Sequence, residues 1–307
     1  VTMAWRVPQA NSLAADTLNL LSQFLYNGKA GLIDLNLTQP MKIQAAGSGY
    51  QGLHDYGSFI LIGLPKKGQT LDEVKALLLD QVARLRRGEF DASLLPSIIN
   101  NYKVDQYRAL QSNSSRADMF VDAFINEQKW GDVVTRLERI SHITKEQIVA
   151  FANHYLGDNN YITVYKQQGV DSTQKKIDKP AITAIPSNRD YQSRFASEIK
   201  DSKVEPIQPQ FVNFKRDLAF AKTKKGLPVV YKQDAESGLS TLALHWEMGE
   251  CADNRYSVAT DYLDYVGTQS KTLAQIKKEL YRLGCFTSFS TGPTYINLVI
   301  SGLDETL

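Results

Sequence analysis

Residues 58–87 read SFILIGLPKKGQTLDEVKALLLDQVARLRR, and this stretch decides the fold class. Ser58 to Leu64 is a short run rich in Ile, Leu and Phe, which is typical of a β-strand. Leu71 to Arg87 instead carries apolar residues at helical spacing. A strand followed by a long amphipathic helix indicates a chain that packs helices against a sheet.

The residues before this stretch extend the pattern. Val1 to Val7 predicts a strand, and the apolar residues between an Asn11/Ser12 cap and Asn27-Gly28 predict a helix. Met41 to Ala46 is predicted to form a further strand. We expect it to pair antiparallel with the strand at residues 58–64, across a turn rich in glycine.

Residues 70–156 are predicted to be almost wholly helical. Thr144 and Gln147 form the capping-box pair of the last of these helices. Tyr161 to Tyr165, with β-branched and aromatic residues, then returns the chain to a sheet. The expected helices are Leu71 to Arg87, Asp91 to Leu110, Ser114 to Glu127 and two shorter segments that end near Leu156.

Residues 169–217 differ in character from both flanks. They are rich in Lys, Asp and Ser, include four prolines (Pro180, Pro186, Pro206 and Pro209), and show no sustained apolar period. The segment is much longer than the usual connection of about five residues within a domain. We therefore predict an inter-domain linker.

After the linker the alternation of strands and helices begins again. The expected strands are Leu218–Lys222, Leu227–Lys232, Leu239–Met248, Cys285–Ser290 and Thr294–Ser301, and the expected helices are Asn254–Val266 and Thr272–Leu283. Ser270 is predicted to cap the second helix and Gly284 to end it. Leu303-Asp304-Glu305 predicts the start of another helix. The sequence thus indicates an α+β protein with two sandwich units, residues 1–168 and 218–307, the second incomplete.

Composition excludes several classes of protein. The 307 residues are 43% apolar and 22% charged, which is ordinary for a globular protein of two domains. Thirty-five basic residues against 33 acidic ones leave a net charge of +2, so no global field attracts nucleic acid or an anionic membrane. No apolar run is long enough to span a bilayer. Cys251 and Cys285 are too few for a metal cluster, and their spacing does not show whether they meet.

The histidines do not form a recognisable metal site. Zinc hydrolases need two neutral imidazoles close together and a carboxylate that activates water. His142 and His154 are too far apart for the i, i+4 spacing, and His54 lies alone in the turn rich in glycine. His245 and Glu247 share a strand face, but no third ligand is visible. We predict no catalytic, cofactor-binding or metal-ligating residue in this chain.

A phosphate-binding loop is also not predicted. Asn27-Gly28-Lys29-Ala30-Gly31 lacks the long glycine spacing of such a loop and the Ser or Thr that would hold magnesium. The segment is better interpreted as the end of a helix.

The order of these segments resembles the pitrilysin/insulinase family of zinc metallopeptidases, whose chains carry repeated α+β units arranged as two halves that close on each other. Residues 1–167 resemble the second unit of a half, through the helix ending Leu25-Tyr26-Asn27-Gly28-Lys29-Ala30-Gly31 and through Ile143-Thr144-Lys145-Glu146-Gln147-Ile148 before the last strand. Residues 218–307 resemble the first unit of the next half, with Lys225-Gly226-Leu227-Pro228-Val229 in its opening hairpin.

The zinc motif of that family is missing from the second unit. An active unit carries His-x-x-Glu-His shortly before a Gly-Thr pair. Gly267-Thr268 is present, but Val258 to Val266 contains neither His nor Glu. Asp261 and Asp264 cannot replace the motif because the neutral nitrogen ligands are absent. The resemblance implies that any catalytic zinc belongs to a unit preceding Val1.

What the resemblance implies is a non-catalytic scaffold, the chamber wall of a zinc metalloendopeptidase that hydrolyses peptides. The expected partners are the missing N-terminal catalytic unit and unfolded peptides, which backbone hydrogen bonds hold against a sheet edge. The sequence does not decide whether the chain forms a homo-oligomer. An extracytoplasmic, periplasmic compartment in a bacterium is expected from the kind of parent protein.

Two alternatives stay open. The parent protein could be a wholly inactive member of the family that acts as a structural or partner subunit, and the gene upstream of Val1 would then lack His-x-x-Glu-His. An unrelated α+β binding protein would show no further helix-then-strand repetition in the residues that follow.

Overall fold

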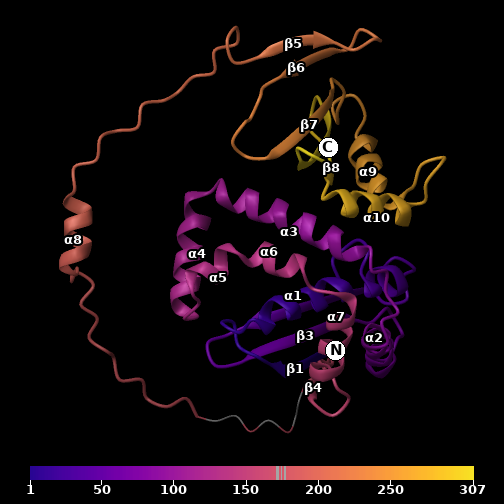
Figure 1. Ribbon diagram of the computed structural model, residues 1–307, viewed down its shortest axis with the longest axis vertical. Coiled ribbons are helices and arrows are strands. Elements are labelled where there is room, and N and C mark those ends of the chain that lie inside the picture. Colours follow the sequence, from indigo (N-terminus) through magenta and orange to yellow (C-terminus); the bar gives the residue numbers. More distant parts are fainter. Residues whose placement is uncertain (171–172, 174, 176–177) are drawn as a thin grey trace. The chain divides into compact units, whose positions relative to one another are not determined.

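The computed structural model describes residues 1–170, 173, 175 and 178–307 (Figure 1). Contacts divide the chain into two compact units. The first contains Val1–Lys166 together with Asp234–Leu307, and the second contains Gln167–Gln233. Five positions of the predicted linker, 171–172, 174 and 176–177, lie outside the described residues. The division into residues 1–168, 169–217 and 218–307 stays a prediction.

A four-stranded antiparallel sheet organises the first 166 residues. Its strand order is β2-β3-β1-β4, with β1 at Thr2–Val7, β2 at Ala45–Gly52, β3 at Gly57–Leu64 and β4 at Tyr161–Val164. The terminal amino group of Val1 donates a hydrogen bond to the carbonyl oxygen of Gly63 at 2.8 Å, and the amide of Gly63 donates back to Val1 at 2.9 Å. This pair fixes the register of the two central strands.

Helices cover one face of this sheet. The covering helices are α1 at Ala14–Leu25, α2 at Leu71–Arg86 and α7 at Lys145–Tyr155 (Figure 1). Alternate strand residues, among them Met3, Trp5, Phe59 and Leu61, are fully buried beneath these helices. The period of two in burial is what a sheet with a single covered face requires.

The remaining helices follow the predicted order. They are α3 at Leu94–Leu110, α4 at Asn113–Ile125, α5 at Trp130–Val134 and α6 at Arg136–Ser141. The predicted capping box at the start of α7 is confirmed, because the Thr144 hydroxyl accepts the amide of Gln147 and the Gln147 side chain accepts the amide of Thr144. Thr70 and Glu73 form the same arrangement at α2.

The prediction of a strand at Met41–Ala46 was wrong. The strand begins at Ala45 and continues through Gly47 and Gly49, which were assigned to a turn. Their amides and carbonyls pair with β3, and this pairing overrides the weak strand preference of glycine. Residues 34–38 form a short π-helix, η1, which the sequence analysis did not predict.

A buried carboxylate organises the loop after α1. Oδ2 of Asp34 accepts the backbone amides of Asn27 at 2.9 Å and Gly31 at 3.0 Å. A Cβ at Gly31 would lie 2.6 Å from the carbonyl oxygen of Leu25, so only glycine fits there. The interpretation of Asn27–Gly31 as a helix end is confirmed, since an internal carboxylate already uses the amides that an anion would need.

We predict that Asp34 makes stability depend on pH. Burial raises the pKa of Asp34 from 3.8 to about 6, so between these values the folded state binds the extra proton. The contribution of this group therefore favours folding at low pH and is lost as the pH rises through about 6. The free energy of unfolding should fall by about 3 kcal/mol across this window on account of Asp34.

Urea unfolding at pH values from about 4 to 8 measures this effect, because the range covers the titration of Asp34 in the folded state. Asp34→Asn should lack this pH-dependent part of the free energy of unfolding, because its amide oxygen still accepts the loop amides but carries no charge. Asp34→Ala should lose about 1–3 kcal/mol at every pH, because the two loop amides become unpaired. An unchanged pH slope in Asp34→Asn would contradict the assignment.

The C-terminal part contains a second antiparallel sheet. Its order is β7-β9-β8, with β7 at Leu239–Trp246, β8 at Phe286–Thr291 and β9 at Ile296–Leu303. Its helices are α9 at Arg255–Tyr262, the 3-10 turn η2 at Leu263–Tyr265 and α10 at Leu273–Leu283. A turn rather than the predicted helix follows Leu303, because β9 continues through that residue.

The N-cap of α10 is Thr272 and not the predicted Ser270. Thr272 accepts the amide of Gln275, whose side chain in turn accepts the amide of Thr272. Only Thr272 has a glutamine three residues later, which completes the capping box. Gly284 ends the helix in the left-handed region at φ 65°, as predicted.

Helix α10 packs against α3 within the first unit. The amide nitrogen Nδ2 of Asn101 donates to the carbonyl oxygens of both Ser97 and Tyr281 at 2.7 Å. Tyr281 is buried in the same hydrophobic cluster as the core of residues 1–156. The returning chain thereby extends the N-terminal core.

The second unit has little tertiary structure of its own. Helix α8 spans Arg194–Asp201, and β5 at Ala219–Lys222 pairs with β6 at Pro228–Tyr231 across the predicted turn, where Gly226 has φ +85°. None of its described residues is buried. An isolated two-stranded hairpin is marginally stable in water.

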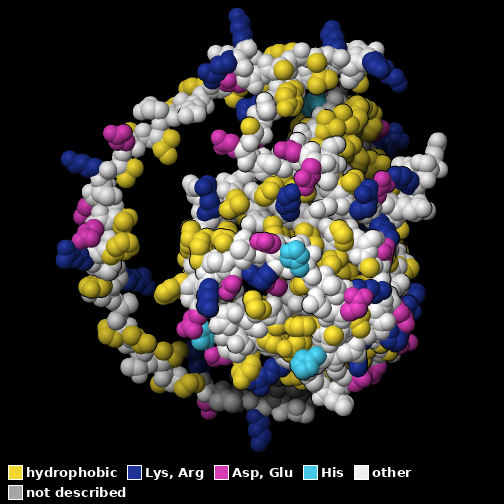
Figure 2. Space-filling view, viewed as in Figure 1, with side chains coloured by type: hydrophobic (Ala, Val, Ile, Leu, Met, Phe, Trp, Pro, Cys, Tyr) yellow, Lys and Arg dark blue, Asp and Glu magenta, His cyan; other side chains and the backbone are white. Residues whose placement is uncertain are grey.

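None of the helices among the described residues is both long enough and apolar enough to cross a bilayer. Basic and acidic side chains are interspersed over the face shown in Figure 2.

Candidate functional site

The histidines lie in separate structural settings. His54 is in an exposed turn, where hydrogen bonds to the carboxylates of Asp55 and Glu127 raise its pKa. His245 on β7 contacts Oδ1 of Asn297 at 2.7 Å through its Nδ1. His154 lies in α7 with its ring edge-on to Tyr155, and His142 caps the end of α6. The histidines visible in Figure 2 lie apart from one another.

These settings do not fit a zinc ion. Within the described ranges, no three side chains of His, Cys, Asp or Glu lie close enough together to hold a metal. Helix α9 and η2 carry Asp261 and Asp264 on exposed positions without an imidazole. A catalytic zinc requires at least two nitrogen ligands, and this segment has none.

The feature with the clearest functional character is the uncovered face of the N-terminal sheet. Ile62, Leu64, Ile162 and Val164 lie on this face, and Ile162 is 73% exposed. The neighbouring positions on the edge strand β2 are Ala45, Gly47 and Gly49. These apolar side chains alternate with the buried ones of the same strands, so they gather on one face, and exposed apolar groups of this kind are candidates for an interaction site.

The two glycines of β2 leave space on this face. A Cβ placed at Gly47 or Gly49 would have no atom within 4 Å. Gly49 pairs with Ile60 and Gly47 pairs with Ile62 on β3. Side chains from outside the sheet can therefore reach the β3 isoleucines across the edge strand.

Strand β2 also presents a free hydrogen-bonding edge. The reciprocal bonds between Val1 and Gly63 mean that odd-numbered β3 residues bond to β1, and even-numbered ones to β2. By the register of β2 with β3, Ala46, Ser48 and Tyr50 then direct their amides and carbonyls outward. These groups have no hydrogen-bond partner in the part of the chain that the structure describes. Such an edge is a template for an added strand.

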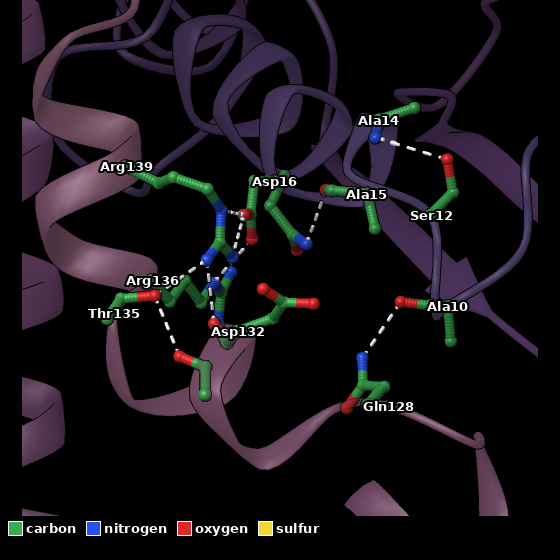
Figure 3. A network of polar contacts seen from close by, with 12 residues as sticks. Ala10, Ser12, Ala14, Ala15, Asp16, Gln128, Asp132, Thr135, Arg136 and Arg139 are labelled. Carbon is green, nitrogen blue, oxygen red and sulfur yellow. Dashed lines mark hydrogen bonds and ion pairs between the residues drawn. The ribbon is translucent and has the colours of Figure 1, made fainter.

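A polar hollow of about 290 Å³ lies beside one end of this edge. Tyr50 and Gly52 of β2 line it, together with the residues that begin α1 and residues from Gln128 to Arg139. The side-chain nitrogen Nε2 of Gln128 donates to the carbonyl oxygen of Ala10 at 2.8 Å, which ties the loop before α5 to the loop before α1 (Figure 3).

Asp16 lines this hollow and pairs with two arginines of α6. Its Oδ1 accepts Nε of Arg136 at 3.0 Å, and its Oδ2 accepts Nε of Arg139 at 3.1 Å and Nη2 of Arg139 at 2.6 Å (Figure 3). Nη1 of Arg139 donates to the carbonyl oxygen of Asp132 and to Oγ1 of Thr135. The paired charges satisfy the nearly buried carboxylate and hold α6 against α1.

We predict that Asp16→Ala lowers the free energy of unfolding by about 2–3 kcal/mol. The loss leaves two guanidinium groups without their shared carboxylate, but both arginine side chains are partly exposed, which limits the cost. Urea denaturation measures it. Asp80→Ala is the control, because the exposed Asp80–Arg84 pair on α2 should contribute less than about 1 kcal/mol. Equal losses in the two variants would refute the structural role of Asp16.

Neither the hollow nor the free edge was predicted from the sequence. Strand addition at a sheet edge was expected, but without a named strand. The hollow has no local signal, since Asp16 and the two arginines are more than a hundred residues apart. The run of glycines in β2 was the available signal, and it was assigned to a turn. Glycine inside a strand often marks a site of close approach.

Comparison with known proteins identifies the fold. No protein-family model matches the sequence, and no curated protein matches it. Among solved structures, the chain is similar to a protease from Helicobacter pylori, with a TM-score of 0.50 and 21% identity over 52% of this chain and 39% of that one. This likeness concerns the fold.

Two further structures have lower scores. The periplasmic protease PqqL from Escherichia coli has a TM-score of 0.41 and 10% identity over 99% of this chain and 37% of that one. An inactive peptidase domain from Bordetella parapertussis has a TM-score of 0.45 and 14% identity over 52% of this chain and 87% of that domain. The chain spans 39% and 37% of the lengths of the two proteases.

The match with a TM-score of 0.50 is to a protease, and its fold agrees with the fold that the sequence resemblance implied. The α+β class, with helices on an antiparallel sheet, is confirmed as well.

Proposed function

We propose that this chain is a non-catalytic wall of the peptide-binding chamber of a zinc-dependent metalloendopeptidase. The observation that carries the proposal is the sheet of β2, β3, β1 and β4, which is buried on one face, open and apolar on the other, and unpaired along β2. The protease fold supports a parent protein of this class.

The open face suits an unfolded peptide. A peptide that adds to β2 receives backbone hydrogen bonds from Ala46, Ser48 and Tyr50 whatever its sequence. Every second peptide side chain would lie over Gly47 and Gly49 and contact Ile60 and Ile62. The wall would thus favour extended segments with apolar residues at alternate positions.

Peptide hydrolysis is assigned to a separate catalytic unit of the parent protein. In that unit zinc would activate the attacking water. The described residues of this chain do not fit the ion, so the bond-breaking step belongs to the other unit. The alternative, a wholly inactive structural or partner subunit, uses the same surface and differs only in whether the parent contains the zinc motif.

We predict that Ser48→Pro weakens peptide binding by about three- to tenfold, because it removes an amide that faces the free edge. Proline is tolerated at such a position because the lost amide does not bond to β3. Ser48→Ala is the matched control, since both variants lose the contact between the Ser48 and Ser22 hydroxyls. Fluorescence anisotropy with a blocked peptide of alternating Val and Thr measures the affinities. Equal affinities for the two variants would exclude strand addition at β2.

We also predict that the chain holds no stoichiometric zinc and cleaves no peptide. Metal analysis of protein purified without chelators, followed by mass spectrometry of the incubated peptide, tests both statements. One tightly held zinc ion per chain would overturn the assignment of catalysis to another unit.

A further inference from the structure

The polar hollow lies where an added strand would place side chains. Tyr50 pairs with the buried Phe59, and the hydroxyl of Ser48 contacts that of Ser22 on α1, so both β2 residues face the helices. A strand that pairs with β2 sends alternate side chains to this same side. Near Tyr50 and Gly52 those side chains would meet the hollow.

Basic groups outnumber acidic ones around the hollow. Lys129, Arg136 and Arg139 line it, against Asp16 and Asp132. Asp16 and Arg139 use their polar atoms on each other and on neighbouring groups. The carboxylate of Asp132 faces the hollow without an ion pair in the described structure (Figure 3).

Arg136 retains unused donors. It binds Asp16 through Nε, and its guanidinium carbon lies 5.4 Å from the ring centroid of Tyr102. Its two terminal nitrogens have no hydrogen-bond partner among the residues described here. The paired terminal nitrogens of a guanidinium match the two oxygens of a carboxylate.

Basic side chains also flank the other end of the edge. Lys66 and Lys67 follow β3, whose last residue Leu64 pairs with Ala45 at the start of β2. The side chain of Gln69 donates to the carbonyl oxygen of Lys42, which places a third lysine nearby. An extended partner along β2 therefore lies between two groups of cations.

We propose that the hollow receives an acidic side chain of the extended peptide paired on β2, with Arg136 as its carboxylate-binding residue. The inference rests on the proposed function, since it requires a peptide at this edge. The occupant is an extended peptide with a Glu or Asp at a position that faces the helices, and apolar residues at the alternating positions on the open face.

The test compares two blocked nine-residue peptides of alternating Val and Thr that differ by a central Glu or Gln. Fluorescence anisotropy with the intact chain at low ionic strength should show about fivefold tighter binding of the Glu peptide, and the difference should shrink with added salt. Arg136→Gln should abolish this preference, and the ratio of the two affinities within the variant is the readout, so that a general change in binding cancels. Asp132→Asn should increase it, because a repelling carboxylate is removed.

Arg84→Gln is the matched control. The Arg84 and Arg136 side chains are both 42% exposed and each donates Nε to an aspartate, but Arg84 lies on α2 and does not line the hollow. It should leave both affinities unchanged. Equal binding of the Glu and Gln peptides to the wild-type chain would overturn this inference and leave the proposed function standing. Failure of both peptides to bind would overturn the two together.

Discussion

The one-sided burial of the N-terminal sheet is the constraint on which the rest of this structure depends. Met3, Trp5, Phe59 and Leu61 are fully buried under α1, α2 and α7, and burying one such side chain contributes about 1.5–3 kcal/mol. Because strand residues alternate, this burial leaves the isoleucines and valines of the same strands facing outward. The core and the proposed peptide-binding wall are therefore two results of one alternating pattern.

The sequence predicted those elements whose signals are local. Three predicted features depend on residues close together in the sequence, and the structure contains them. They are the capping box at Thr144 and Gln147, the strand at Ser58–Leu64 and the left-handed Gly284. Where two local signals competed, the prediction was wrong: Ser270 was chosen over Thr272, although only Thr272 has the glutamine that completes a box. The glycines of β2 were misassigned because pairing with β3, a tertiary effect, outweighs propensity.

The candidate site was much harder to predict than the fold. Which backbone amides of β2 are free depends on the bonds between Val1 and Gly63, which join β3 to β1 on the side of β3 away from β2. The hollow requires α6 to pack beside α1 so that Asp16 meets Arg136 and Arg139. No spacing rule connects residues so distant in the sequence. The absence of a zinc motif from Val258–Val266, by contrast, could be read directly, since ligand chemistry is a property of residue types.

The packing of α10 on α3 has a consequence for how this sequence can change over generations. Asn101 and the buried Tyr281 join segments on either side of residues 167–233, so the intervening chain closes a large loop. The free-energy cost of closing a flexible loop grows only with the logarithm of its length, by about 0.6 kcal/mol for each doubling. Insertions and deletions in that segment should be nearly neutral, whereas a single substitution at Tyr281 would be strongly selected against.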